Sequence, residues 1–172
     1  MPSTLQARFT TFGEFDYGSF AVASGQTFKA DDFVYLDSNG QLTIMAASGN
    51  DVGNIRGLGV SLGDAADCLA QSTLTGKTIK CEVKILIPGL SFFTLPVYHS
   101  TAASAVIAEN EIDTPLTLPL RNQGGIWVVN KENNGTNDRI IVKNKVEDQP
   151  WSEQYGLFIC TVMDAFALMK AS

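Results

Sequence analysis

Turn-forming residues recur at short intervals along this chain, and their spacing restricts the fold more than any other feature of the sequence. Dipeptides such as Ser24-Gly25 and Asn39-Gly40 interrupt the first half repeatedly. The segments between them are short and rich in branched and aromatic residues, which favours strands over helices. With 172 residues, the chain has the length of one domain. We therefore expect a single, mainly β domain.

Several segments have the pattern of individual strands. Residues 33–37 and 41–45 flank Asn39-Gly40, a pair that adopts the positive φ angles of a tight hairpin. Apolar residues alternate with small or polar ones over residues 55–62 and 79–87, which predicts two half-buried strands.

The second half of the chain predicts another hairpin and a final strand. Residues 126–130 and 139–143 are apolar and flank the polar loop 132–138, so we expect them to pair with each other. Residues 157–162 form the final strand. Helices of about two turns are predicted at three places: residues 65–70, 101–109 and 163–170.

The first 22 residues are unusually aromatic and have neither helical nor strand periodicity. The rings belong to Phe9, Phe12, Phe15, Tyr17 and Phe20. Two interpretations are open: residues 1–22 form an extended arm that buries these rings on a partner, or the rings close one end of the β domain. In the first case residues 23–172 form the β-rich domain, with a further β unit from about residue 90, and deletion of residues 1–22 leaves it folded.

Charge and hydropathy restrict the partners. The chain has 12 Lys and Arg against 18 Asp and Glu, a net charge of −6, and no basic cluster, so we expect no nucleic-acid partner. The longest apolar run, residues 157–163, is shorter than the roughly 20 residues of a membrane span, and we expect no membrane partner. The N-terminus has no secretory signal pattern.

Residues that carry chemistry are sparse, and we expect no enzyme, cofactor or metal site. Gly76-Lys77-Thr78 resembles the end of a phosphate-binding loop, but Gln71 stands where that loop needs a glycine. His99 is the single histidine, and no nucleophile motif accompanies it. The three cysteines are widely and irregularly spaced, which predicts buried, reduced thiols: Cys68, Cys81 and Cys160.

One part of the sequence resembles a known family. Residues 23–42 (ASGQTFKADDFVYLDSNGQL) and 56–65 (RGLGVSLGDA) are similar to the decoration, or cement, proteins of tailed-phage capsids. In that family, an aspartate precedes a VYLD-like strand, the chain turns at a glycine, and a GVAL-D-A-like strand returns. The resemblance implies a small β-barrel or β-tulip unit, and a sandwich-like arrangement also stays open.

The resemblance also implies a function. A cement protein is a structural virion protein that binds the outer surface of the capsid and stabilises the joints between major capsid protein subunits. It would be assembled in the host cytoplasm as a homo-oligomer, with a trimer as the family's common arrangement. The five aromatic residues of the arm would make the capsid or intersubunit contact.

A second hypothesis is a head-fibre or tail-associated adhesion protein that binds host surface carbohydrate. Its site would lie in the loops at residues 91–101 and 132–138, because sugar sites combine aromatic faces with polar groups. The candidate aromatic residues are Tyr98, Trp127 and Trp151, of which Trp127 lies in an apolar strand and is a core candidate.

Overall fold

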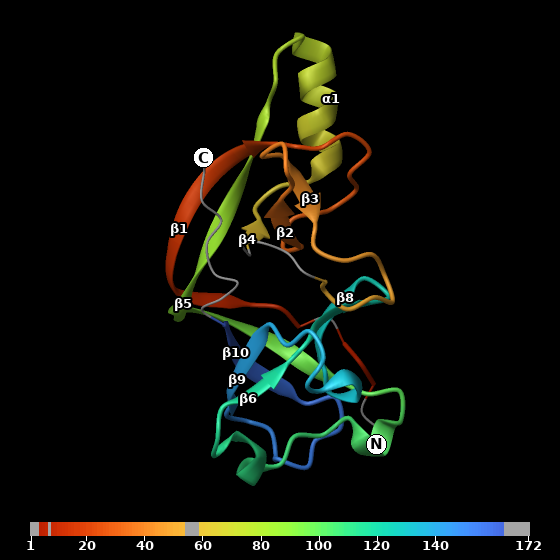
Figure 1. Ribbon diagram of the computed structural model, residues 1–172, viewed down its shortest axis with the longest axis vertical. Helices are drawn as coiled ribbons and strands as arrows, with labels where there is room; N and C mark the ends of the chain where they lie inside the picture. The colour runs from red at the N-terminus through yellow and green to blue at the C-terminus, as the bar shows by residue number, and fades with distance from the viewer. Residues whose placement is uncertain (1–3, 7, 54–58, 164–172) are drawn as a thin grey trace.

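The longest strand, β5 (Lys80–Tyr98), organises the fold because four other strands pair with it. The computed structural model describes residues 4–6, 8–53 and 59–163 (Figure 1). The other elements, in chain order, are β1 (Thr11–Ala21), β2 (Phe33–Leu36), β3 (Leu42–Ile44), β4 (Gly59–Ser61), α1 (Ala65–Thr75), η1 (Ala102–Ser104), η2 (Glu109–Ile112), β6 (Leu116–Leu118), β7 (Leu120–Gln123), β8 (Ile126–Asn130), η3 (Lys131–Asn133), β9 (Ile140–Lys145) and β10 (Leu157–Val162).

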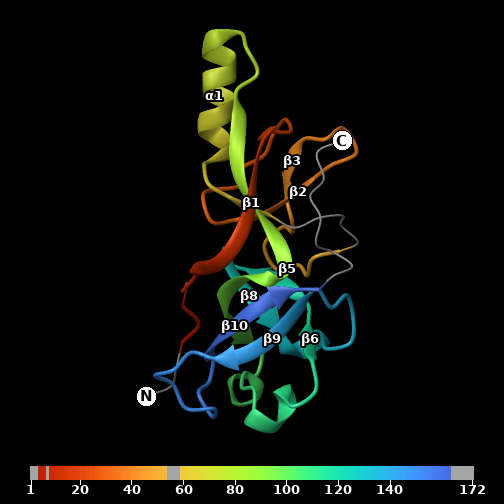
Figure 2. The same cartoon turned by 90° about the vertical axis from the view of Figure 1, so that its left-hand side faces the viewer.

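The fold is mainly β, which confirms the predicted class. The strand order is β3-β2-β4-β5-β10-β9-β6, with β1 beside β5, and β8 between β5 and β7. The sheet curls into half of a barrel because β5 bends sharply near residues 88–90 (Figures 1 and 2). α1 and β1 to β4 lie at one end, and β6 to β10 lie at the other.

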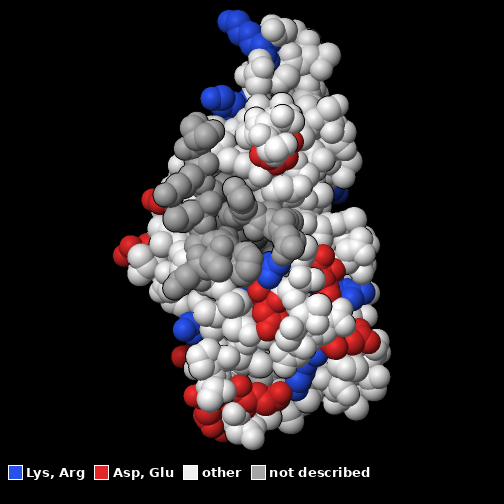
Figure 3. Space-filling view, viewed as in Figure 1, with Lys and Arg blue, Asp and Glu red and all other residues white. Residues whose placement is uncertain are grey.

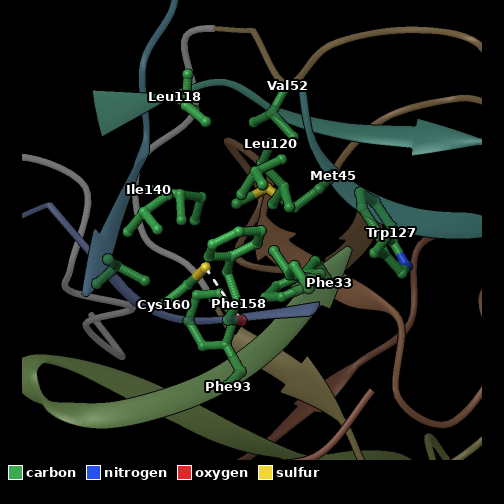
Figure 4. Packing of buried hydrophobic residues seen from close by; sticks show 14 of the residues in the cluster. Phe33, Met45, Val52, Phe93, Leu118, Leu120, Trp127, Ile140, Phe158 and Cys160 are labelled. Carbon is green, nitrogen blue, oxygen red and sulfur yellow. Dashed lines mark hydrogen bonds between the residues drawn. The ribbon is translucent and has the colours of Figure 1, made fainter. Parts of the chain in front are cut away.

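Two groups of buried side chains fill the fold. Successive side chains of β2 point to opposite faces of the sheet, so this strand contributes to both groups. Phe33 belongs to the larger group, where its ring packs edge-on against Phe93 and Trp127 at centroid distances of 5.3 and 5.2 Å (Figure 4). The next residue, Val34, points the opposite way and packs with Phe20 in the smaller group. A single strand therefore connects both cores.

The first predicted hairpin is confirmed, but its turn differs from the expected one. β2 and β3 are antiparallel, with Val34 opposite Ile44. Gly40 has a positive φ of 71°, whereas Asn39 has none. The Asp37 carboxylate instead accepts the N–H of Asn39 at 2.8 Å and that of Gln41 at 2.9 Å. The side chain of Asp37 thus supports a wider turn than the Asn-Gly pair predicted.

The second predicted hairpin is wrong. β8 pairs with β7, and β9 pairs with β6 and β10. Residues 126–130 are strand β8 as predicted, but the nearest turn is Gly124-Gly125, with φ angles of 62° and 86°. Two successive positive φ angles form a two-residue hairpin turn, and this short turn prevails over the longer loop 132–138.

The remaining elements differ mainly in length. α1 continues to Thr75, five residues beyond the predicted end, and only 3-10 turns form within residues 101–109. β5 contains the predicted strand 79–87 except its first residue and continues through Pro88, and β10 has the predicted bounds. Residues 55–58 of a predicted strand and residues 164–170 of a predicted helix lie outside the described residues. No described helix is both long and apolar enough to cross a bilayer.

Residues 11–21 belong to the sheet, in contrast to the expected arm that precedes the domain. β1 pairs with β5 from Ala21 opposite Lys80 to Thr11 opposite Phe93. Residue 22 is therefore not a structural boundary. The sequence pattern concealed this strand because Gly13 interrupts its pairing with a register shift.

Candidate functional site

Three of the five candidate contact residues face the body of the protein. Phe9 packs edge-on against Phe33 at 5.4 Å between ring centroids, and so extends the larger core. Phe20 is buried in the smaller core. Phe15 is half-buried, with the Lys84 ammonium 5.2 Å from its ring centroid. These rings fit the interpretation in which the aromatic residues close part of the β domain.

The other two candidate residues are exposed. Phe12 has 44% of its surface exposed, and Tyr17 has 65%. They lie on either side of the register shift between Gly13 and Phe15, so strict alternation does not relate them. The structure thus leaves two separate exposed rings, and Phe12 stacks on Phe92 with an interplanar angle of 18°.

Phe12 lies at a corner where β1 follows the bend of β5. Gly13 has φ +100°, and a Cβ there would lie 2.2 Å from the carbonyl oxygen of Leu90, so only glycine fits. Residues 87–90 bulge out of the ladder, which leaves the Leu90 side chain 46% exposed. We call Phe12 and Leu90 the corner residues.

Two buried hydroxyl groups satisfy the backbone of this corner. Ser91 Oγ donates to the carbonyl oxygen of Glu14 and accepts the N–H of Ile87 at 2.8 Å. Thr161 Oγ1 accepts the N–H of Gly89 at 3.1 Å and donates to the carbonyl oxygen of Ser91 at 2.8 Å. Because both hydroxyls are buried and bonded, the corner is a rigid platform for its exposed side chains.

Replacing Ser91 with alanine is expected to lower the free energy of unfolding by about 1–3 kcal/mol, because it leaves buried backbone groups without partners. Urea unfolding followed by fluorescence measures the change. Ser19→Ala, at an exposed position of β1, is the matched control and should change stability by less than about 0.5 kcal/mol. Equal effects of the two substitutions would contradict the role assigned to Ser91.

α1 and the turn after it project from the body (Figures 1 and 2). Ala65 is the single residue of the helix that is buried, and Leu74 is 80% exposed. The Ser72 hydroxyl accepts the N–H of Ile79 at 2.9 Å, which connects the helix to the chain that returns into β5. An 11-residue helix gains most of its stability from packing, so this projection is weakly supported within one molecule.

A polar cleft of about 540 Å³ lies at the opposite end of the molecule. The residues that line it include Arg8, Pro96, Gln149, Glu153, Tyr155 and Leu157. Tyr155 has φ 54°, an uncommon conformation for an aromatic residue, and its N–H donates to the carbonyl oxygen of Ala105 at 2.8 Å. The Gln149 amide bonds both the N–H and the carbonyl oxygen of Leu157 at 2.7 Å. This wall of the cleft is therefore held in one shape.

The charged groups nearest the core hold loops in place. Asp51 accepts hydrogen bonds from the amides of Asn130 and Asn133 at 2.8 and 2.6 Å, and its carboxylate lies 3.7 Å from the guanidinium of Arg121. Within the described part of the chain, no three His, Cys, Asp or Glu residues gather in a way that could hold a metal ion.

Glu111 forms an ion pair with Lys131 at 2.8 Å. Partial burial raises the pKa of Glu111, but the hydrogen bonds from Lys131 and from the N–H of Ala108, together with the charge of Lys131, outweigh it, so that the pKa is lowered overall. This pair connects η2 to η3, the short helix after β8, and so fixes a surface loop.

The aromatic residues of the carbohydrate hypothesis contact different parts of the body. Trp127 is 6% exposed and donates its indole N–H to Asp32 at 2.8 Å, which places it in the core, as its apolar strand indicates. Trp151 packs on Phe158 at 6.2 Å, whereas Tyr98 lies under the guanidinium of Arg121. The structure does not gather these rings around one site.

The cysteine prediction is confirmed for burial at two of three positions. Cys81 and Cys160 are buried, and Cys68 is half-buried. Burial, together with a hydrogen bond and charge repulsion from Cys81, raises the pKa of Cys68 to about 12. Burial also raises the pKa of Cys160 well above its ordinary value. At neutral pH Cys68 and Cys160 are therefore protonated thiols of low nucleophilicity.

A search of protein-family models finds no match to this sequence, and comparisons with curated proteins and with solved structures find no significant match either. The corner, the α1 projection and the cleft are therefore interpreted from their own geometry. Sequence reasoning missed the cleft because its residues come from distant segments, and it missed the corner although Gly13, Pro88 and Gly89 are the residues that mark it.

Proposed function

We propose that this chain is a structural protein of a tailed-phage virion, located on the outer surface of the capsid. There it binds the major capsid protein and stabilises the joints between coat subunits. It acts as a homo-oligomer, with a trimer as the favoured form, and its role requires no catalytic residue. Many repeated contacts on a symmetric shell make a modest single contact effective.

The observation that carries this proposal is the arrangement of the segment that resembles decoration proteins. Its residues bond one another: the N–H of Ser61 donates to the carbonyl oxygen of Asp32 at 2.9 Å, and the Asp64 carboxylate accepts the N–H of Ala30 at 2.8 Å. Phe33 stands opposite Val60 where β2 pairs with β4. The described parts of the two similar stretches, residues 23–42 and 59–65, thus belong to one β unit, as the resemblance implies.

The corner supplies a surface suited to a joint between subunits. Phe12 and Leu90 are large, exposed apolar side chains on a platform that glycine geometry and buried hydroxyls hold rigid. A rigid apolar group loses little conformational entropy on binding, so more of its burial energy contributes to affinity. Full burial of such a side chain contributes about 1.5–3 kcal/mol, and because Phe12 and Leu90 are 44% and 46% exposed, burying the rest on the coat contributes about half of that.

The proposal is tested by mixing the purified chain with capsids that lack it and measuring saturable co-sedimentation. We expect Phe12→Ser and Leu90→Ser each to weaken binding by about three- to tenfold, without a change in the circular dichroism spectrum. Leu62→Ser removes another exposed leucine, away from the corner, and should bind as the wild type does. A wild-type chain that does not bind would contradict the function, whereas an equal loss with Leu62→Ser would contradict the role of the corner.

A further inference from the structure

The far end of the α1 projection carries only positive charge. Between Asp67 and Glu82 the chain has two charged residues, Lys77 and Lys80, and both are exposed. The chain as a whole has a net charge of −6. Figure 3 shows basic side chains at the end of the molecule where α1 projects. We call residues 68–80 the α1 tip.

The α1 tip also presents apolar surface. Leu74, with 80% of its surface exposed, is the most exposed of the large hydrophobic side chains described. The helix beneath it is weak, because Ser72, Thr73 and Thr75 donate their hydroxyls to carbonyl oxygens four residues earlier. An exposed leucine beside two lysines, on a projection that the body barely supports, is suited to an acidic, partly apolar partner surface.

The polar cleft at the opposite end of the same molecule is lined by both Arg8 and Glu153, and further acids are exposed beside it. The loop before β10 carries the exposed acids Glu147 and Asp148, and Glu153 from the same loop lines the cleft described above. Pro96, Tyr155 and Leu157 add apolar atoms to the cleft wall. Acidic side chains lie at this end in Figure 3, interspersed with basic ones. The cleft volume of about 540 Å³ has room for a leucine side chain.

We propose that copies of this chain bind head to tail, with the α1 tip of one copy seated in the polar cleft of the next, beside the exposed acids Glu147 and Asp148. Leu74 enters the cleft, and Lys77 and Lys80 face Glu147 and Asp148. A contact between two different surfaces is heterologous, so it closes into a ring when the rotation between copies allows it and otherwise continues as an open chain. This contact needs no capsid, so its test is separate from that of the proposed function.

The experiment is sedimentation velocity of the purified full chain over a range of concentrations, at low and at high salt. The wild type should associate, and high salt should weaken the association because exposed charges are screened. Lys77→Glu with Lys80→Glu should weaken it about tenfold or more, as should Glu147→Lys with Asp148→Lys. Lys29→Glu with Lys143→Glu changes the net charge as the Lys77 and Lys80 reversal does, but at other exposed sites, and should associate as the wild type does.

Mixing the two charge-reversed variants distinguishes a head-to-tail contact from any other. In each variant alone, the α1 tip and the acids beside the cleft carry charges of the same sign. In the mixture, the reversed tip of one variant can bind the reversed cleft of the other. The wild-type tip of the second variant can then bind the wild-type cleft of the first. We expect the equimolar mixture to recover association.

Leu74→Ser should weaken the association of the wild-type chain as the charge reversals do, and Leu62→Ser is its apolar control. A wild type that stays monomeric at every concentration, a mixture that does not recover, or an equal loss in the lysine control would each overturn the proposal.

Discussion

Deletion of residues 1–22 is expected to prevent the chain from folding. The deletion removes β1, which pairs with β5 over almost its whole length, and with it Phe20 of the smaller core and Phe9 at the edge of the larger one. It also uncovers the long edge of β5, and exposed edges of this kind promote aggregation. This expectation reverses the one drawn from sequence, in which residues 23–172 fold alone.

The measurement is the solubility of the truncated chain and the presence of a cooperative urea transition. Deletion of residues 1–6 is the control, since it keeps Phe9 and all of β1 and should leave a cooperative transition. A soluble fragment 23–172 with a cooperative transition close to that of the full chain would contradict the structural role of β1. It would support the earlier hypothesis that residues 1–22 form an arm outside the folded domain.

Substitution of Phe33 by alanine is expected to cost about 3–5 kcal/mol of stability, because it leaves a cavity at the centre of the larger core. The ring is fully buried, and its centroid lies 5.2 to 5.4 Å from those of Trp127, Phe93 and Phe9. Natural domains are stable by roughly 5–15 kcal/mol, so this single change removes a large part of the total.

Equilibrium urea unfolding measures the effect, and Phe12→Ala is the matched control. Phe12 has the same side chain, but it is 44% exposed and stacks on one ring, so its loss should cost less than about 1.5 kcal/mol. If Phe33→Ala and Phe12→Ala were equally stable, the larger core would not be centred on Phe33.

Local features of this fold were predictable from sequence, and non-local pairing was not. The β2 and β3 strands are joined by a short turn, so the residues that predict their pairing lie next to each other in the sequence. β8 was correctly identified as a strand, but its partner depended on whether Gly124-Gly125 or the loop at 132–138 formed the turn. The strands β6, β9 and β10 meet through long connections, for which sequence patterns give no register.

The candidate surfaces were predictable only in part. The aromatic content of residues 9–20 drew attention to a real strand, yet the burial of Phe20 and the exposure of Tyr17 depend on how β1 lies along β5. The α1 tip was not predicted, because Lys77 and Lys80 form no basic cluster in the sequence and Glu82 follows two residues after Lys80. Its relation to the cleft could not be predicted, because only the folded chain places the two at opposite ends.

The proposed capsid role requires many copies of this chain in each virion. The copy number of this chain in purified particles, measured by quantitative mass spectrometry against the major capsid protein, tests it most directly. The account predicts a stoichiometry comparable to that of the coat protein, because cement occupies joints across the whole lattice. A handful of copies per particle, or none, would contradict it.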